Sequence, residues 1–493
     1  MSFVLNFPLF MIVSCLFSSV LSNILHPKTA RNLTLCLTFT ITVLNVIILG
    51  YVMGQGQTFT YMMGHFPHPW GNELRIGTIE ALFAAIFAFV LFLTLLGGKQ
   101  SINEGIRSDK GNLYYALCDL VMSCLLVLVY TNDIFTGYVF VEICTLASCG
   151  ILMIRDNGQT IAAAIRYMVF ALIGSGLFLF GIVFLYNITG NLLIPDLNES
   201  VLALWESGQY RLPLLAAMCF ISIGLAIKSG LFPFHFWMAD TYGEAVPASS
   251  GILSGVISKA YIFLLIKIIR DVFTVEIFQA SGISNIIFVM AICGVVMGSV
   301  SATRENNISK MIAYSSAAQI GYIYMGIGLS TNAALTASLF QIAAHAITKP
   351  ALFLASYRLS FVSAGAKKFK HIQGASRRDP FAAICFTQGA LSMVGIPLTA
   401  GFITKFLFGT AAFGHGGLKL VLTLVTLIIS TVLNTIYFTK TIIRIYTSTE
   451  HDIQVPVRAE YAVSGVLFMI INFALGIMSS SIIGIITEGI LLF

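Results

Sequence analysis

The sequence predicts an all-α polytopic membrane protein, and three observations support this fold class. Of the 493 residues, 57% are hydrophobic and only 10% are charged, and the mean hydropathy is +0.91. A soluble protein carries about 25% charged residues, so no soluble fold could cover this much apolar surface. In lipid, backbone polar groups must pair internally, which allows helices or closed barrels. The apolar runs are long and continuous, which favours helices.

The apolar runs divide the chain into candidate spans. In chain order they are 3–24, 33–53, 78–97, 113–130, 134–154, 161–186, 212–239, 247–269, 283–301, 308–329, 332–357, 380–408, 417–443 and 460–492. Since a spanning helix needs ~20 apolar residues, the runs predict about fourteen transmembrane helices. The first run could pass for a signal peptide, but residues 1–23 contain no Lys or Arg, so we expect a retained helix.

Basic residues are distributed unevenly between alternate loops. With the N-terminus placed outside, the inward loops and helix ends hold eighteen Lys and Arg, including Arg358, and the outward side holds five: Arg75, Arg211, Lys267, Arg270 and Lys419. This is a strong positive-inside bias. We therefore expect a multi-pass protein of the plasma or inner cell membrane with its N-terminus outside. The basic segment 367–378 is expected at anionic lipid headgroups, with docking of a partner subunit as the alternative.

Apart from the basic residues counted above and from Glu460 and Glu488 at the ends of the last run, four lysines and three acidic residues lie inside the apolar runs: Lys228, Lys259, Lys349, Lys405, Glu80, Asp119 and Glu142. A charged lysine at the bilayer centre costs about 2.5–3.5 kcal/mol on insertion scales. Burial disfavours the ammonium and a nearby carboxylate favours it, so a lysine between these influences can take and release a proton. The pattern predicts a proton relay. For Lys349 and Lys405, snorkelling to the interface is the alternative.

The buried acidic residues differ in how clearly they point to a role. Glu142 is the natural partner for a buried lysine, either in transport or in a purely structural ion pair. Glu80 lies near a helix start, where a carboxylate also stabilises the helix dipole. The roles of Glu80 and Asp119 therefore stay open.

Two histidines could extend a proton path, because histidine titrates near neutrality. They are His235 and His345, and each could equally be a core histidine bonded to a backbone carbonyl. His345 and Lys349 are four residues apart, which places both on one helix face, one turn from each other.

Two spans are interrupted close to a buried lysine. Pro233 follows Lys228, and Pro397 precedes Lys405, each with a glycine nearby. Proline removes a backbone donor and blocks the carbonyl one turn earlier, so broken helices line cavities. Two interrupted helices in corresponding positions predict an inverted-repeat transporter with its sites near the midplane.

The cysteines argue against a metal or cofactor site, and the net charge does not indicate a nucleic-acid partner. None of the nine cysteines forms a Cys-x-x-Cys pair, and all lie in apolar runs, so we expect no metal and no cofactor. The formal charge of +6 first reports membrane orientation, so we expect no nucleic-acid partner.

Four segments resemble a known family. Residues 228–265 (KSGLFPFHFWMADTYGEAVPASSGILSGVISKAYIFLL), 307–328 (NISKMIAYSSAAQIGYIYMGIG), 345–349 (HAITK) and 395–405 carry the resemblance. They are similar to hallmark segments of the antiporter-like proton-pumping subunits of respiratory complex I, of Mrp-type Na⁺/H⁺ antiporters and of membrane-bound hydrogenases. The resemblance covers roughly 115–445.

The resemblance implies a fold of fourteen helices in which helices four to eight and nine to thirteen form inverted repeats, with helices seven and twelve broken. The expected organisation is three N-terminal helices in 1–112, a first repeat in 113–272, a second repeat in 283–446 and a C-terminal helix in 458–493.

The resemblance also implies roles for the charged residues. By motif position Glu142 is the helix-five glutamate and Lys228 is its partner on broken helix seven. Lys259 is the central lysine of helix eight, and Lys405 is the exit residue of helix twelve. The segment 345–349 falls on helix eleven.

The expected function follows from that family. The chain is most similar to the Mrp D-type subunit or its hydrogenase counterpart, so we expect a proton-translocating subunit with other membrane subunits as partners and with Na⁺ open as a second ion. The chain stops at Phe493 without a long lateral helix, so we do not expect the largest complex I pump subunit. One alternative is a proton-pumping subunit of a hydrogenase or NADH dehydrogenase, driven by redox chemistry in its partners. The others are a stand-alone carrier of an organic solute and a structural anchor.

Overall fold

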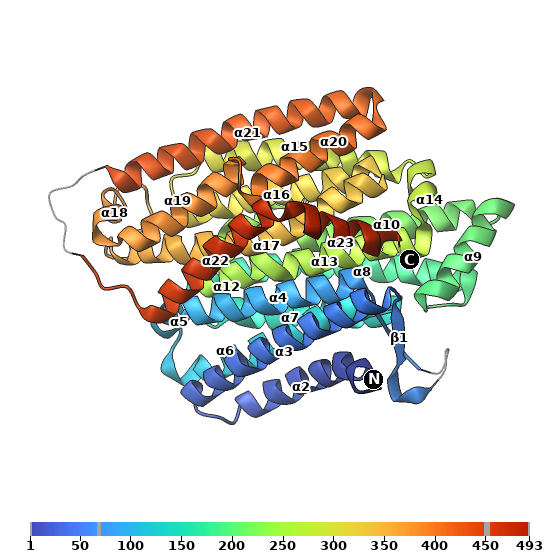
Figure 1. Ribbon diagram of the computed structural model, residues 1–493, viewed down its shortest axis with the longest axis horizontal. Helices are drawn as coiled ribbons and strands as arrows, with labels where there is room; N and C mark the ends of the chain where they lie inside the picture. The colour runs from blue at the N-terminus through green and yellow to red at the C-terminus, as the bar shows by residue number, and fades with distance from the viewer. Residues whose placement is uncertain (1, 67–70, 448–453, 492–493) are drawn as a thin grey trace.

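The computed structural model describes residues 2–66, 71–447 and 454–491 as a bundle of long helices whose axes are roughly parallel (Figure 1). Within these residues, ten helices are long and apolar enough to cross a membrane. They are α3 (Pro27–Gln55), α4 (Thr78–Gly97), α6 (Gly111–Tyr130), α7 (Ile134–Met153), α8 (Gly158–Thr189), α10 (Arg211–Ser229), the continuous pair α12 (Pro247–Ile252) and α13 (Ser258–Ile268), α15 (Ile283–Arg304), α21 (Gly417–Tyr446) and α22 (Ala459–Ile477).

Four further helical segments bring the described part of the chain to the fourteen spans that the sequence predicts. They are α2 (Phe7–Ser22), α16 (Ile308–Leu329), α17 (Asn332–Phe361) and the pair α19 (Pro380–Val394) and α20 (Ala400–His415). Helices α16 and α17 are less apolar than the others because they carry buried serine, glutamine, histidine and lysine side chains. Both lie in the middle of the bundle, where these polar groups face protein instead of lipid (Figure 1).

Both predicted interruptions are confirmed. Helix α10 ends at Ser229, and the chain continues as α11 (Phe236–Glu244) after a non-helical segment that begins at Gly230, with φ of 84°. Helix α19 ends at Val394, before Gly395 with φ of 90°, and α20 follows. Glycine adopts this left-handed conformation without the steric penalty of a Cβ, and it commonly ends helices in this way.

Short elements cover the two ends of the bundle. At one end lie a hairpin of β1 (Phe59–Met62) and β2 (Glu73–Ile76), paired antiparallel, and the helices α9 (Ile194–Ser207) and α14 (Val275–Ala280) (Figure 1). At the other end lie α5 (Lys99–Gly105) and α18 (Ala375–Arg378). The remaining elements are α1 (Ser2–Leu5), η1 (Met63–His65), η2 (Ser108–Lys110), η3 (Leu253–Ile257), η4 (Ile269–Phe273) and α23 (Ser479–Leu491).

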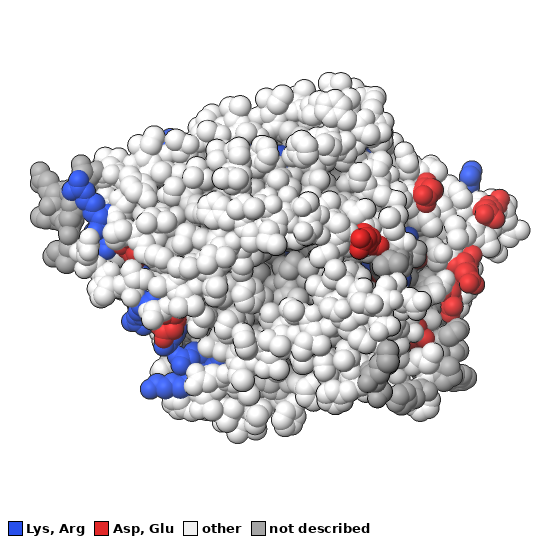
Figure 2. Space-filling view, in the orientation of Figure 1, with Lys and Arg blue, Asp and Glu red and all other residues white. Residues whose placement is uncertain are grey.

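The two ends differ in charge. Figure 2 shows Lys and Arg gathered at the end that carries α5 and α18, and Asp and Glu at the end that carries α9. The N-terminus lies at the acidic end (Figure 1). This segregation agrees with the uneven distribution of basic residues along the sequence.

Two basic residues in the predicted loop set are placed differently by the structure. Lys267 and Arg358 are each 2% exposed, and each forms a buried ion pair, with Glu80 and Asp379 respectively. The sequence placed these two residues only by side of the membrane and did not predict their burial. The reason is physical: each carboxylate partner belongs to another helix and is distant in sequence. The positive-inside bias remains strong without these two residues.

Candidate functional site

The first polar cluster lies at the break in α10. Lys228 occupies the last turn of α10 with a fully buried side chain, whereas the side chain of Glu142 on α7 is 23% exposed. Lys228 Nζ lies 3.3 Å from Glu142 Oε1 and donates a hydrogen bond to Thr145 Oγ1 at 2.6 Å. The carboxyl end of a helix favours a cation, because its last carbonyls lack intrahelical partners. One ammonium is thus held among a carboxylate, a hydroxyl and a helix end.

Close packing of α8 against α10 sets the position of this lysine. A Cβ built on Gly174 of α8 would lie 2.7 Å from the Gly224 carbonyl oxygen and 2.9 Å from Lys228 Cγ. Small residues let membrane helices approach this closely. The Lys228 stem packs against the glycine, and its ammonium reaches Glu142 on α7.

Tyr261 connects the first cluster to α13. Lys228 Nζ lies 5.8 Å from the centroid of the Tyr261 ring, within the range of a cation–π interaction. Tyr261 lies two residues after Lys259 on the same helix. The lysine of α10 thus contacts the same helix that carries the central lysine, Lys259.

Lys259 follows a π-helical segment, η3, which divides α12 from α13. Its side chain is fully buried, and its ammonium contacts the Ser254 carbonyl oxygen and lies 3.0 Å from Ser258 Oγ. Short π segments occur often at functional sites because they release backbone groups from the regular hydrogen-bond ladder. The ammonium of Lys259 is held by neutral oxygens instead of by a carboxylate.

Helix α17 packs directly on this π segment. A Cβ built on Gly255 would lie 2.7 Å from Pro350 Cγ and 3.2 Å from the Ala346 carbonyl oxygen. Pro350 has no backbone N–H, so the carbonyl one turn earlier lacks its usual helical partner. The contact brings the residues around Pro350 close to Lys259.

Lys349 and His345 are both buried on α17. Lys349 is fully buried, donates to the Ile312 carbonyl oxygen at 3.0 Å and contacts Ser315 Oγ, which excludes snorkelling. His345 is 1% exposed, and neither ring nitrogen hydrogen-bonds to another described residue. Helix α17, which carries His345 and Lys349, packs against α13 and η3, beside Lys259.

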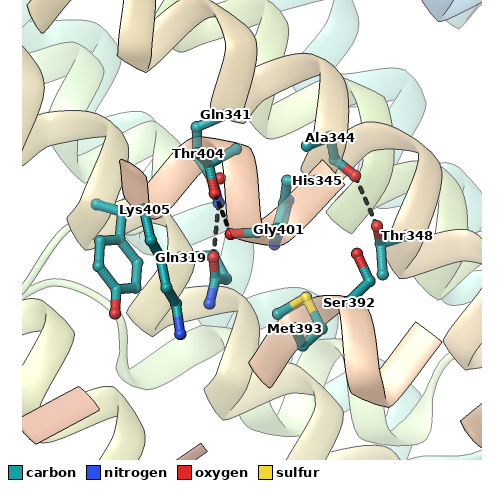
Figure 3. Close-up of a pocket in the computed structure, with 11 residues that line it drawn as sticks. Gln319, Gln341, Ala344, His345, Thr348, Ser392, Met393, Gly401, Thr404 and Lys405 are labelled. Carbon is teal, nitrogen blue, oxygen red and sulfur yellow. Dashed lines mark hydrogen bonds between the residues drawn. The ribbon is translucent and has the colours of Figure 1, made fainter. Parts of the chain in front are cut away.

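A pocket connects His345 with Lys405 (Figure 3). Its lining comes from α16, α17, α20 and the end of α19: Gln319, Tyr322, Gln341, Ala344, His345, Thr348, Ser392, Met393, Gly401, Thr404 and Lys405. Gln341 Nε2 donates to Gln319 Oε1 at 2.6 Å. Most of these side chains are neutral and polar, which suits a path that also admits water.

Lys405 closes the series at the second helix break. Its Nζ donates to the Val394 carbonyl oxygen at 2.5 Å and to Thr431 Oγ1 at 2.8 Å. Val394 is the last residue of α19, so the ammonium is bound at the end of a broken helix and does not extend to the interface. Each of the two broken helices thus has a lysine beside its break, although Lys405 binds a helix-terminal carbonyl and Lys228 binds side chains of α7.

The structure brings together six of the seven predicted site residues in three groups. Glu142 pairs with Lys228, Lys259 lies beside His345 and Lys349, and the pocket joins His345 to Lys405.

The seventh predicted residue, His235, lies apart from these groups. It is 4% exposed, in the break between α10 and α11, where it stacks on Phe236 with ring centroids 4.8 Å apart. Its Nδ1 makes no hydrogen bond to another described residue.

Sequence reasoning missed the neutral partners and one charged pair. Thr145, Tyr261, Gln319 and Thr431 surround the lysines, yet such residues are too common in helices to stand out. Glu142 and Thr145 are three residues apart on one helix face, and this spacing is the one signal in the sequence from which Thr145 could have been found as a partner of the lysine. The other omission is the Lys267–Glu80 pair at 3.5 Å, since each residue was assigned separately to a helix end.

In the part of the chain that the structure describes, no group of three or more His, Cys, Asp and Glu side chains could hold a metal ion. The groups present are ammonium, carboxylate, imidazole, hydroxyl and amide. These groups bind and exchange protons.

Several known proteins are similar to this chain. A family described as "NADH:quinone oxidoreductase/Mrp antiporter, TM" matches residues 131–431, a segment that contains all seven predicted site residues. NADH-quinone oxidoreductase subunit N of Desulforudis audaxviator is 28% identical over 444 residues, which cover 90% of this chain and 86% of that protein. The D subunit of the Na(+)/H(+) antiporter of Alkalihalophilus pseudofirmus is 27% identical over 351 residues, 69% of each chain.

A solved structure shows the same fold. A chain of the Mrp complex from Dietzia sp. superposes with a TM-score of 0.88 over 99% of this chain and 97% of that chain. The two sequences are 21% identical, so this likeness concerns the fold alone.

Proposed function

The chain belongs to the NADH:quinone oxidoreductase/Mrp antiporter transmembrane family, and on that premise we propose that it translocates protons as one subunit of a multisubunit membrane complex. The observation that carries this proposal is the pairing of the buried Lys228 ammonium with the Glu142 carboxylate beside a helix break. An ammonium in low dielectric depends on its carboxylate partner, so opening the pair makes the proton available.

The proposed path runs along the buried polar groups. A proton enters from the inward side and reaches Lys228, which Glu142 holds charged. When the pair opens, Lys228 passes its proton beside the Tyr261 ring to Lys259. His345 and Lys349 lie next on this path, and the pocket leads from there to Lys405, from which the proton leaves.

The direction of transport depends on the coupled driving force, because one charge across ~100 mV corresponds to about 2.3 kcal/mol. The proposed orientation places the N-terminus and the acidic end outside, in the plasma or inner cell membrane. The proposed organisation has two inverted repeats, 113–272 and 283–446, each with its own broken helix. The basic segment 367–378 contacts anionic headgroups in this arrangement.

Two driving forces fit the family. In the first, which follows the similarity to the D-type antiporter subunit, the proton moves against Na⁺ carried by the same complex. In the second, favoured by the 90% coverage of the chain by an NADH-quinone oxidoreductase subunit N, redox chemistry in partner subunits drives the proton. Purification with partners separates them: antiporter subunits and Na⁺-driven proton movement support the first, and redox subunits with reductant-driven movement support the second.

A direct test is proton movement in proteoliposomes that contain the whole complex, followed with a pH-sensitive dye. We expect Glu142→Gln and Lys228→Met to abolish transport while the complex still assembles. Lys419→Met is the control, because Lys419 is a lysine outside the proposed path that donates to the Gly328 carbonyl oxygen at 2.7 Å. Wild-type rates in either relay variant would refute the proposal. Solute-dependent currents from the purified chain alone would favour a stand-alone carrier.

A further inference from the structure

A second buried lysine–glutamate pair lies near the acidic end of the bundle. Lys267 of α13 and Glu80 of α4 are 2% and 1% exposed, and Lys267 Nζ lies 3.5 Å from Glu80 Oε1. Lys267 also donates to the Val129 carbonyl oxygen of α6 at 3.1 Å. The other carboxylate oxygen, Glu80 Oε2, makes no hydrogen bond within the described residues. The pair has the same chemistry as Lys228–Glu142 and is more deeply buried.

The charges around the pair restrict which groups can exchange a proton. Asp271 forms ion pairs with Arg270 at 2.6 Å and with Arg75 at 3.9 Å. With Lys267 and Glu80, the cluster has three cations and two carboxylates, one positive charge in excess when all are ionised. Arginine does not deprotonate in proteins, and Asp271 is held by two arginines. Within this cluster, Lys267 and Glu80 are therefore the groups that can gain or lose a proton.

Glu80 faces the outer end of the molecule. A Cβ built on Gly77, the residue before α4, would lie 2.5 Å from Glu80 Oε2, so the carboxylate folds back over the helix start. The preceding strand, β2, places Glu73 3.2 Å from Asn132 Nδ2, and Asn132 Oδ1 is buried without a partner among the described residues. Asp133, the next residue, lines an outer pocket. Polar groups thus extend from the region of Glu80 to the surface.

Lys267 lies on the helix of the central lysine. It follows Lys259 by eight residues on α13, about 12 Å along the axis at 1.5 Å per residue. The side chains between them are apolar except for Tyr261. A buried apolar stretch thus separates the two lysines along the helix, and a proton crosses such a stretch only when water enters it.

We propose that the Glu80–Lys267 pair is a second proton-transfer site, through which protons pass from Lys228 and Lys259 to the outer side. The Lys267 ammonium gives a proton to the Glu80 carboxylate, so an N–H bond breaks, an O–H bond forms and both groups become neutral. Glu80 releases this proton to water at the outer end and is again a carboxylate. Lys267 regains a proton from the Lys259 ammonium when water enters the apolar stretch between them. The inference rests on the proposed function.

Lys267→Arg is the decisive variant. Arginine keeps the positive charge and the ion pair but cannot release a proton. We expect proton movement by the whole complex in proteoliposomes to fall at least tenfold, with unchanged assembly and melting temperature. Lys419→Arg, the same substitution at a lysine outside both pairs, keeps the wild-type rate. A wild-type rate for Lys267→Arg overturns the inference.

Two further variants keep the inference testable and separate it from the proposed function. If Lys267→Arg does not assemble, the double variant Glu80→Gln with Lys267→Met replaces both charges, a change that buried ion pairs often tolerate. A tenfold loss supports the second site, and a wild-type rate overturns it. Lys228→Arg is measured in parallel. If it also transports at the wild-type rate, the proposed function itself fails, whereas an inactive Lys228→Arg beside an active Lys267→Arg contradicts the second site alone.

Discussion

Lys405 Nζ donates a hydrogen bond of 2.5 Å to the carbonyl oxygen of Val394, where α19 ends. Lys228 lies differently at the other break: it belongs to the last turn of α10, and its ammonium contacts Glu142 and Thr145 of α7. Each helix break thus has a lysine beside it, and of these two lysines Lys405 is the one bound to a helix-terminal carbonyl group, a position that stabilises a cation. The proposed roles of both lysines depend on the breaks.

The hydrogen bond from Lys228 to Thr145 can be tested by Thr145→Val. The two side chains have similar shapes, but valine cannot accept the 2.6 Å hydrogen bond from the ammonium. A buried donor that loses a partner costs about 1–3 kcal/mol. We expect a severalfold lower rate of proton movement in proteoliposomes with a normal yield of complex. Thr145→Ser, which keeps the hydroxyl, is the control, and equal rates in the two variants would contradict a role for this bond.

Gly224→Ala tests the close contact of α8 with α10. The new Cβ would lie 2.6 Å from the Gly174 carbonyl oxygen, so the helices must separate. Overpacking of this kind costs about 1–3 kcal/mol. We expect a lower melting temperature and a lower transport rate, because Lys228 moves with α10. Gly176→Ala on α8, with no atom within 4 Å of the new Cβ, serves as the control and should melt like wild type.

Gly395→Ala tests the second break. The backbone there has φ of 90°, and the new Cβ would lie 3.0 Å from Lys405 Cδ. Backbone strain at such a position costs on the order of 1–3 kcal/mol. Gly416→Ala, at φ of 70° with open space around the Cβ, separates strain from contact with the lysine. We expect both variants to melt at lower temperature, but only Gly395→Ala to slow proton movement. Equal transport would show that Lys405 does not depend on the break.

The lowered pKa of the buried Lys367 predicts that the stability of the protein depends on pH. This residue lies in the loop after α17, and burial lowers its pKa from 10.5 to about 8, against the opposing effect of Glu244. Between pH 8 and 10.5 the unfolded chain binds more protons at this site than the folded one, so the free energy of unfolding rises with pH. We expect the melting temperature of wild type to rise relative to that of Lys367→Met over this range. A constant difference between the two proteins from pH 7 to 10 would contradict the prediction.

Much of the fold could be predicted because lipid imposes simple rules. Long apolar runs predicted fourteen spans, and the described residues contain them with boundaries shifted by a few positions. The two breaks were visible as proline near glycine, since both residues act on the local backbone. Helices α16 and α17 were recognisable although their polar side chains make them less apolar than other spans.

The site could be predicted only in part. Charged residues inside apolar runs are rare, so Lys228, Lys259, Lys349, Lys405 and Glu142 stood out. Pairing depends on how helices from distant parts of the chain pack, and the sequence alone does not show this. For that reason the Lys267–Glu80 and Arg358–Asp379 ion pairs were missed. His235 was grouped with the relay by residue type, but the structure places it in an aromatic stack.

The proposed relay is tested most directly by the rate of proton movement in proteoliposomes that contain the complex with Lys228→Arg. Arginine preserves the charge and the pairing with Glu142 but cannot deprotonate, so it separates proton transfer from structural support. The relay mechanism predicts an assembled complex with less than about a tenth of the wild-type rate, the loss expected when one obligatory transfer step is blocked. An assembled complex that moves protons at the wild-type rate would contradict it.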